Sequence, residues 1–157
     1  MPHRQRIAHV HLDEKTMVRR QAEVEHERAI AIYDLLEGNY FAPAGDYTGP
    51  YALHLRLEDN RLLFDVRSEQ GETLLQVPLP LKQFQSLVKD YFLVCESYYT
   101  AIKKSSPSQI EAIDMGRRGL HNEGSELLKE RLAGKIDIDF DTARRLFTLV
   151  CILHIRG

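Results

Sequence analysis

Tyr51-Ala-Leu-His-Leu-Arg-Leu-Glu58 decides the fold, because apolar and polar residues alternate through it with a period of two. Alternate residues of a strand point to the same face, so this pattern predicts a half-buried β-strand. Asp59-Asn60 follows as a turn, and two further apolar runs, at residues 62–66 and 74–77, are separated by the polar segment 68–72. Closely spaced strands joined by turn residues predict a three-stranded antiparallel meander. We expect Pro78 and Pro80 to end it.

Helical periodicity flanks this meander on both sides. The segments 20–37 and 81–104 lack interior glycine and proline, and residues 81–104 carry a wide apolar stripe able to cover a sheet. The remaining pattern predicts strands at 6–12 and 135–140, an aromatic loop at 40–50, and helices at 107–115, 126–133 and 142–154. Together these elements predict one α+β domain over residues 1–157, with an antiparallel sheet of three to five strands packed by four or five helices.

The composition is that of an ordinary globular protein. The chain has 157 residues, 43% of them hydrophobic and 28% charged, and its formal net charge is -2. This charge gives no global attraction to nucleic acid or acidic membranes, and we expect neither as a partner. Cys95 and Cys151 lie in apolar helical stretches, which predicts buried thiols of a reducing compartment. The longest apolar run, residues 146–155, is too short to span a bilayer, which needs about 20 residues. We therefore expect a cytoplasmic protein.

The segment 114–125, Asp-Met-Gly-Arg-Arg-Gly-Leu-His-Asn-Glu-Gly-Ser, places three glycines within nine residues of an otherwise helical region. Glycine inside a helix costs about 1 kcal/mol relative to alanine, so this density predicts a break after Met115. A glycine-rich loop before a new helix near Ser125 also exposes backbone N–H groups to an anion.

Arg117, Arg118, His121 and Asn122 supply hydrogen-bond donors in this segment. Guanidinium groups make charge-assisted, bidentate contacts with phosphates and carboxylates. Our first hypothesis is therefore a binding or regulatory module that uses these four residues to hold a small anionic ligand. The competing interpretation is structural: the glycines admit a neighbouring helix, and the arginines pair with nearby carboxylates such as Asp114.

An enzymatic function is the second hypothesis. His26 with Glu23 and Glu27, or His121 with Glu123, offers the residue types of a hydrolase. The chain contains no zinc-protease helix motif, nucleophile elbow, P-loop or dinucleotide fingerprint, so we expect no metal and no cofactor. The string Asp137, Asp139 and Asp141 lacks the glycine and the final acid of a calcium loop. It predicts a strand followed by a capped helix.

The third hypothesis is an interaction module that binds a protein partner or a second copy of the chain. Tyr98, Tyr99 or the aromatic loop from Tyr40 to Tyr51 would supply the contact, because tyrosine combines apolar area with a polar tip. Two observations separate this hypothesis from the first. A single exposed patch of loop aromatics favours a partner, and convergence of Arg117, Arg118 and His121 into a concave pocket favours a ligand.

Three long motifs resemble a known family. They are Glu25-His-Glu-Arg-Ala-Ile-Ala-Ile-Tyr-Asp-Leu, Val88-Lys-Asp-Tyr-Phe-Leu-Val-Cys-Glu-Ser-Tyr-Tyr, and Pro107-Ser-Gln-Ile-Glu-Ala-Ile-Asp-Met-Gly-Arg-Arg-Gly-Leu-His-Asn-Glu-Gly-Ser-Glu-Leu-Leu. These motifs are similar to those of the uncharacterised protein family numbered 0262, known from alphaproteobacteria, and the resemblance extends over nearly the whole chain. It implies a bacterial cytosolic setting and carries over no functional residue.

Overall fold

The computed structural model describes residues 4–12 and 22–153. Along the chain the elements are β1 (Ile7–Leu12), α1 (Ala22–Glu37), β2 (Phe41–Pro43), β3 (Tyr51–Glu58), β4 (Arg61–Ser68), β5 (Thr73–Pro80), α2 (Lys82–Lys104), α3 (Pro107–Leu132), β6 (Ile136–Ile138) and α4 (Phe140–Leu153). This is the predicted α+β architecture, and its buried apolar residues form one core.

The main sheet has the strand order β1-β3-β4-β5. The antiparallel meander β3-β4-β5 is confirmed, with Leu53 opposite Val66 and Leu55 opposite Phe64 on the buried face. Strand β1 adds to β3 in the parallel direction, so the sheet is mixed rather than wholly antiparallel. A parallel neighbour requires a crossover connection, and the chain segment between β1 and β3 contains α1.

The prediction that Pro78 and Pro80 end the meander is confirmed at Pro80, the last residue of β5, but the strand continues through Pro78. Strand β5 is an edge of the sheet and pairs with β4 alone. Proline lacks a backbone N–H, and an edge strand tolerates it where that N–H would face away from the neighbouring strand.

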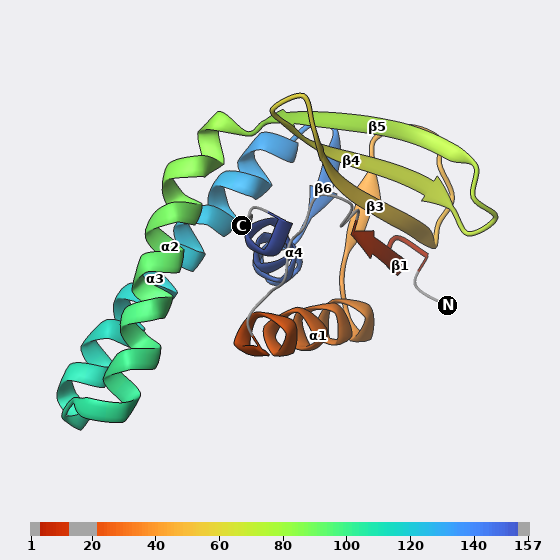
Figure 1. The fold of residues 1–157 in the computed structure, drawn as a ribbon. Coiled ribbons are helices and arrows are strands. Elements are labelled where there is room, and N and C mark those ends of the chain that lie inside the picture. The colour runs from red at the N-terminus through yellow and green to blue at the C-terminus, as the bar shows by residue number, and fades with distance from the viewer. Residues whose placement is uncertain (1–3, 13–21, 154–157) are drawn as a thin grey trace.

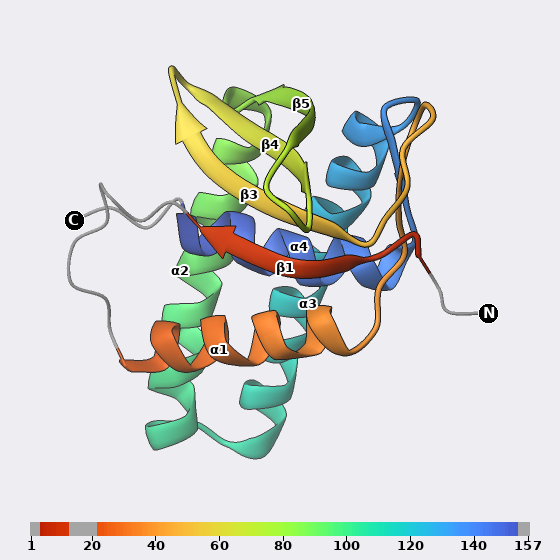
Figure 2. The same cartoon turned by 90° about the vertical axis from the view of Figure 1, so that its right-hand side faces the viewer.

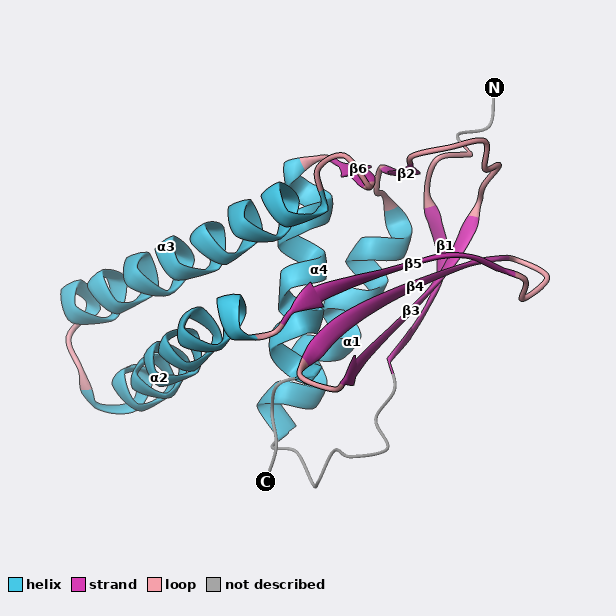
Figure 3. Ribbon diagram, turned by 90° about the horizontal axis from the view of Figure 1, so that it is seen from above, coloured by secondary structure: helices cyan, strands magenta, loops and turns pink. Residues whose placement is uncertain are grey.

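The four helices lie on one side of the main sheet (Figure 1). Helix α4 is the central one, and most of its residues are buried, including Leu146, Phe147, Leu149 and Val150. Helix α1 runs beside it (Figure 2). Helices α2 and α3 form a long antiparallel hairpin that extends past the rest of the body (Figure 3). Among the described helices, none combines the length and apolar character needed to cross a membrane.

Helix α3 is continuous, so the predicted break after Met115 and the predicted new helix near Ser125 were wrong. Its start is as the sequence indicates: Ser106 caps it through a capping box with Gln109, and Pro107 follows in the first turn. The glycine penalties are offset because α3 packs along both α2 and α4. Tertiary contacts override the local propensity here.

Part of the predicted aromatic loop is a strand, since β2 pairs antiparallel with β6. Phe41 and Tyr51 are fully buried with their ring centroids 5.9 Å apart, whereas Tyr47 is 36% exposed. The aromatics therefore anchor this segment to the core and do not form one exposed patch. Cys95 and Cys151 are both buried, as predicted.

Candidate functional site

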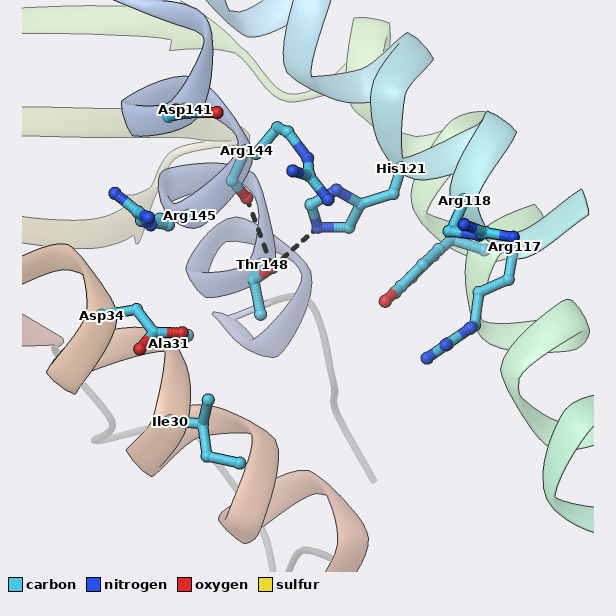
Figure 4. Close-up of a pocket in the computed structure, with 11 residues that line it drawn as sticks. Ile30, Ala31, Asp34, Arg117, Arg118, His121, Asp141, Arg144, Arg145 and Thr148 are labelled. Atoms are coloured by element: carbon cyan, nitrogen blue, oxygen red, sulfur yellow. Dashed lines mark hydrogen bonds between the residues drawn. The ribbon is translucent and has the colours of Figure 1, made fainter. Parts of the chain in front are cut away.

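A pocket of about 390 Å³ lies where α1, α3 and α4 approach one another, with one residue from α2. Its lining is dominated by charged side chains, four of them arginines (Figure 4). The lining residues are Ile30, Ala31, Asp34, Tyr91, Arg117, Arg118, His121, Asp141, Arg144, Arg145 and Thr148.

Helical spacing brings these side chains together. Arg117 and His121 are one turn apart on α3, and Arg144 and Thr148 are one turn apart on α4. Residues at i and i+4 lie one above the other on a helix face, and the two helices pack against each other. Two arginines of α3 and two of α4 therefore line the same pocket, and Asp34 lines it from α1 (Figure 4).

The two arginines of α3 share one carboxylate. Arg117 donates to Asp114 Oδ1 from both Nε and Nη2, and its guanidinium carbon lies 4.5 Å from the centroid of the Tyr98 ring. Arg118 Nε approaches Asp114 Oδ2 at 3.3 Å, but the Arg118 side chain is 60% exposed. The hydrogen bond from Arg117 holds the pKa of Asp114 below its ordinary value. Arg117 is thus fixed in place, and Arg118 remains largely open to solvent.

The charged side chains that α1 and α4 contribute to the pocket are less neutralised than that of Arg117. Arg145 donates from Nη1 to the carbonyl oxygen of Gly38 at 2.8 Å, which is a contact with a neutral group. Within residues 4–12 and 22–153, neither the guanidinium of Arg144 nor the carboxylate of Asp34 has a hydrogen bond or an ion pair. The pocket therefore contains a cation and an anion on separate walls that do not contact each other.

His121 is a neutral imidazole at the base of these charges. Burial, followed by the positive charges of Arg144 and Arg117, lowers the pKa of His121 to about 4. Its Nε2 lies 2.7 Å from Thr148 Oγ1, and the Thr148 hydroxyl donates to the carbonyl oxygen of Arg144. The donor in the contact between Nε2 and the Thr148 hydroxyl depends on the imidazole tautomer. Nδ1 is buried without a hydrogen-bond partner.

The structure brings together three of the four residues predicted for the ligand site: Arg117, Arg118 and His121. Asn122 is exposed and does not line the pocket. The predicted helix start at Ser125 does not exist, because Ser125 is a buried residue inside α3 whose hydroxyl donates to the carbonyl oxygen of His121. Sequence reasoning missed Arg144, Arg145 and Asp34, since no local pattern places α4 and α1 beside residues 117–121.

The structural interpretation of the glycine segment also holds in part. A Cβ at Gly124 would lie 2.1 Å from the Phe147 ring, so this glycine allows α3 and α4 to approach closely. Gly116 and Gly119 have nothing within 4 Å of the corresponding position. Only one of the three glycines therefore serves a helix contact.

The other candidate residues do not come together as a site in the described part of the chain. His26 is exposed, and the side chains of Glu23 and Glu27 lie outside the described part of the chain. Asp139 Oδ1 accepts from the backbone N–H of Thr142 at the start of α4, which confirms the predicted strand and capped helix. In the described ranges, no three His, Cys, Asp or Glu side chains are grouped as metal ligands.

Comparison with known proteins confirms the resemblance of the motifs. The model of the family described as "Uncharacterised protein family (UPF0262)" matches residues 4–156. The chain belongs to this family. It is 76% identical to the UPF0262 protein of Paramagnetospirillum magneticum, with both chains covered completely. It is 62% identical to the UPF0262 protein of Rhodospirillum rubrum, covering 94% of this chain and 91% of the relative.

A further relative is the UPF0262 protein of Xanthobacter autotrophicus, 60% identical over 97% of this chain and 93% of the relative. No solved structure matches the chain. Neither the family description nor the names of these relatives states a ligand or a reaction. The function therefore has to be inferred from the pocket.

Proposed function

We propose that this UPF0262 protein binds a small anion, carrying a phosphate or carboxylate group, in the pocket between α1, α3 and α4. The observation that carries the proposal is the convergence of four arginines on one pocket, whose lining in the described part of the chain includes two carboxylates, Asp34 and Asp141. Ligand pockets are few in a protein, and concave sites with convergent polar groups are the usual ones.

The available positive charge supports this proposal. Among the described residues the guanidinium of Arg144 has no hydrogen bond or ion pair, and Arg118 is mostly exposed beside a carboxylate that Arg117 already occupies. Guanidinium groups stay charged at every physiological pH, and their forked donors match the oxygens of phosphate and carboxylate. An anion between Arg118 and Arg144 would therefore gain charge-assisted hydrogen bonds without first breaking a strong ion pair of Arg144.

The state of His121 favours binding over hydrolysis. With a pKa of about 4, the imidazole is uncharged at neutral pH and is a weak base. Its Nε2 is held by Thr148, and within the described ranges no carboxylate contacts the ring. The ring serves best as a packed wall under the arginines, next to Tyr91 and Phe147.

A thermal-shift screen tests the proposal. The purified protein is heated with inorganic phosphate, pyrophosphate, nucleotides, phosphosugars and small carboxylic acids, at constant ionic strength. A ligand that binds the native state stabilises it by RT ln(1 + [L]/Kd), about 2.7 kcal/mol at a hundredfold excess over Kd. We expect stabilisation by at least one anionic class.

Two variants make the screen specific to the pocket. Arg118→Gln combined with Arg144→Gln should abolish the stabilisation while leaving the ligand-free melting temperature nearly unchanged. Arg61→Gln, an exposed arginine of β4, is the matched control and should behave as the wild type. The proposal is wrong if no anion stabilises the wild type, or if the double variant is stabilised as strongly as the wild type.

A further inference from the structure

We infer that the ligand is a small zwitterion, in which a short aliphatic chain joins a phosphate or carboxylate to an ammonium group; this inference rests on the anion site proposed above. The pocket shows a separation of charge that a simple anion would leave unused. Arginines of α3 and α4 form one part of the lining, and the carboxylate of Asp34 belongs to α1 on another (Figure 4).

Asp34 is the key residue. Its carboxylate lines the pocket without an ion pair or hydrogen bond inside the described part of the chain, so no arginine nitrogen lies within 4.0 Å of it. A purely anionic ligand would be attracted by Arg144 and repelled by Asp34. A ligand that presents an ammonium to Asp34 turns this repulsion into a charge-assisted hydrogen bond.

Apolar residues in the lining fit an aliphatic stem. Ile30 and Ala31 precede Asp34 on α1 and line the same pocket, and Ile30 is 46% exposed. Covering this side chain with methylene groups removes apolar surface from water at a gain of about 25 cal/mol per Å². The described lining thus contains cationic, apolar and anionic groups, which are complementary to an anion, a short carbon chain and an ammonium.

Among the described residues that line the pocket, every cation is an arginine and none is a lysine. No ammonium group of the described lining is therefore present to pair with Asp34. A neutral hydroxyl could also donate to a carboxylate, but the charge of Asp34 favours a cation over a neutral donor. The inferred ligand thus differs from a sugar phosphate because its donor to Asp34 is a charged ammonium and not a neutral hydroxyl.

Matched ligands test this inference by isothermal titration calorimetry on the full chain. O-phosphoethanolamine is compared with ethyl phosphate, which has nearly the same size and lacks the ammonium. At neutral pH the ethyl ester is at least as well attracted through its phosphate, so the anion site alone predicts no preference for the amino compound. We expect O-phosphoethanolamine to bind about tenfold more tightly. Glycerol 3-phosphate provides the hydroxyl comparison and should bind like ethyl phosphate.

The Asp34→Asn variant locates the preference. It should reduce the ratio of the two affinities to about one while ethyl phosphate binds as tightly as before, or more tightly. Asp137→Asn, which changes an exposed aspartate of β6 outside the pocket, is the control and should keep the tenfold ratio.

The outcomes separate the two proposals. If ethyl phosphate and O-phosphoethanolamine bind equally to the wild type, or if Asp34→Asn keeps the preference, the zwitterion inference is wrong and the anion site stands. Tighter binding of glycerol 3-phosphate than of O-phosphoethanolamine also overturns it, in favour of a hydroxylated ligand. If none of these compounds, phosphate included, binds the wild type, the anion site itself is wrong and the inference falls with it.

Discussion

Two arginine clusters of this protein use the same residue types in different ways. On the face of the main sheet that the helices leave uncovered, Arg56 and Arg67 both donate to Asp65 Oδ2, at 3.1 and 2.8 Å. In the pocket, Arg117 and Arg118 share Asp114, but Arg144 forms no ion pair with any acidic residue of the described ranges. The first cluster neutralises its carboxylate from two sides. The second retains positive charge next to a pocket.

The burial of the carboxylates explains the difference. The side chain of Asp65 is 1% exposed, and that of Asp114 is 25% exposed. Burial alone raises the pKa of Asp65, but hydrogen bonds from Arg67 and Arg56 outweigh it and hold the net pKa below its ordinary value. We therefore expect the ion pairs of Asp65 to stabilise the fold, and the charge of Arg144, which has no ion pair in the described ranges, to contribute little to stability.

The largest effect is expected for Asp65→Asn. Removing one partner of a buried ion pair leaves charges uncompensated and costs about 3–5 kcal/mol, with the lower end expected here because both arginines are partly exposed. Urea denaturation should show a loss of about 3 kcal/mol in the free energy of unfolding. Glu58→Gln removes the exposed partner of Arg56 and should cost less than about 0.5 kcal/mol. Equal free energies of unfolding for Asp65→Asn and Glu58→Gln would contradict the structural role given to the ion pairs of Asp65.

A second comparison, between two glycines of α3, tests whether Gly124 is needed for close packing against α4. Gly124→Ala places a methyl group against the buried Phe147 ring and should destabilise by about 2 kcal/mol. Gly119→Ala meets no neighbour and should stabilise by about 0.5–1 kcal/mol through helix propensity. Thermal denaturation of both variants measures this. A stable Gly124→Ala protein would show that α3 and α4 do not meet as closely as the structure indicates.

The buried imidazole of His121 should make stability depend on pH. Its folded-state pKa of about 4 lies below the unfolded value of 6.5, so between these values the unfolded chain binds more protons. This contribution is fully present above pH 6.5 and declines as the pH falls towards 4, with about 2 kcal/mol lost at pH 5. His121→Gln should flatten the pH dependence of unfolding between pH 7 and 5 by up to that amount. An unchanged slope would mean that His121 titrates normally.

The smallest effect on stability is expected for Arg144→Gln. The guanidinium has no partner in the described structure, so the free energy of unfolding should change by less than about 0.5 kcal/mol. The same change should weaken anion binding about tenfold or more, since it removes a charge-assisted contact. Parallel calorimetry and denaturation measure both quantities. A large loss of stability would show that Arg144, like Arg56 and Arg67, has a structural role.

How far the sequence predicts this molecule depends on how local each signal is. The alternation at Tyr51–Glu58 is a property of eight neighbouring residues, and the meander followed from it correctly. The break expected in α3 was wrong because contacts with α2 and α4 outweigh the local cost of glycine. Likewise, Pro78 could be placed inside a strand only once β5 was known to be an edge.

The site shows the same limit. Arg117, Arg118 and His121 could be selected from their spacing and chemistry on one segment. Asp34 belongs to α1, which precedes this segment in the chain, and Arg144 belongs to α4, which follows it. Only the packing of α1 and α4 brings these two residues to the pocket. The sequence thus selected three residues that line one pocket, but it did not show that Asp34 and Arg144 line the same pocket.

The most direct test of the anion site is a titration of the ¹⁵N-labelled protein with inorganic phosphate, followed by two-dimensional NMR. The account predicts that amide shifts concentrate in residues 117–121 of α3 and 141–148 of α4. The amides of Arg61–Ser68 in β4, around the neutralised arginine cluster, should not move. Shifts centred on β4, or none at phosphate concentrations that change the melting temperature, would contradict the account.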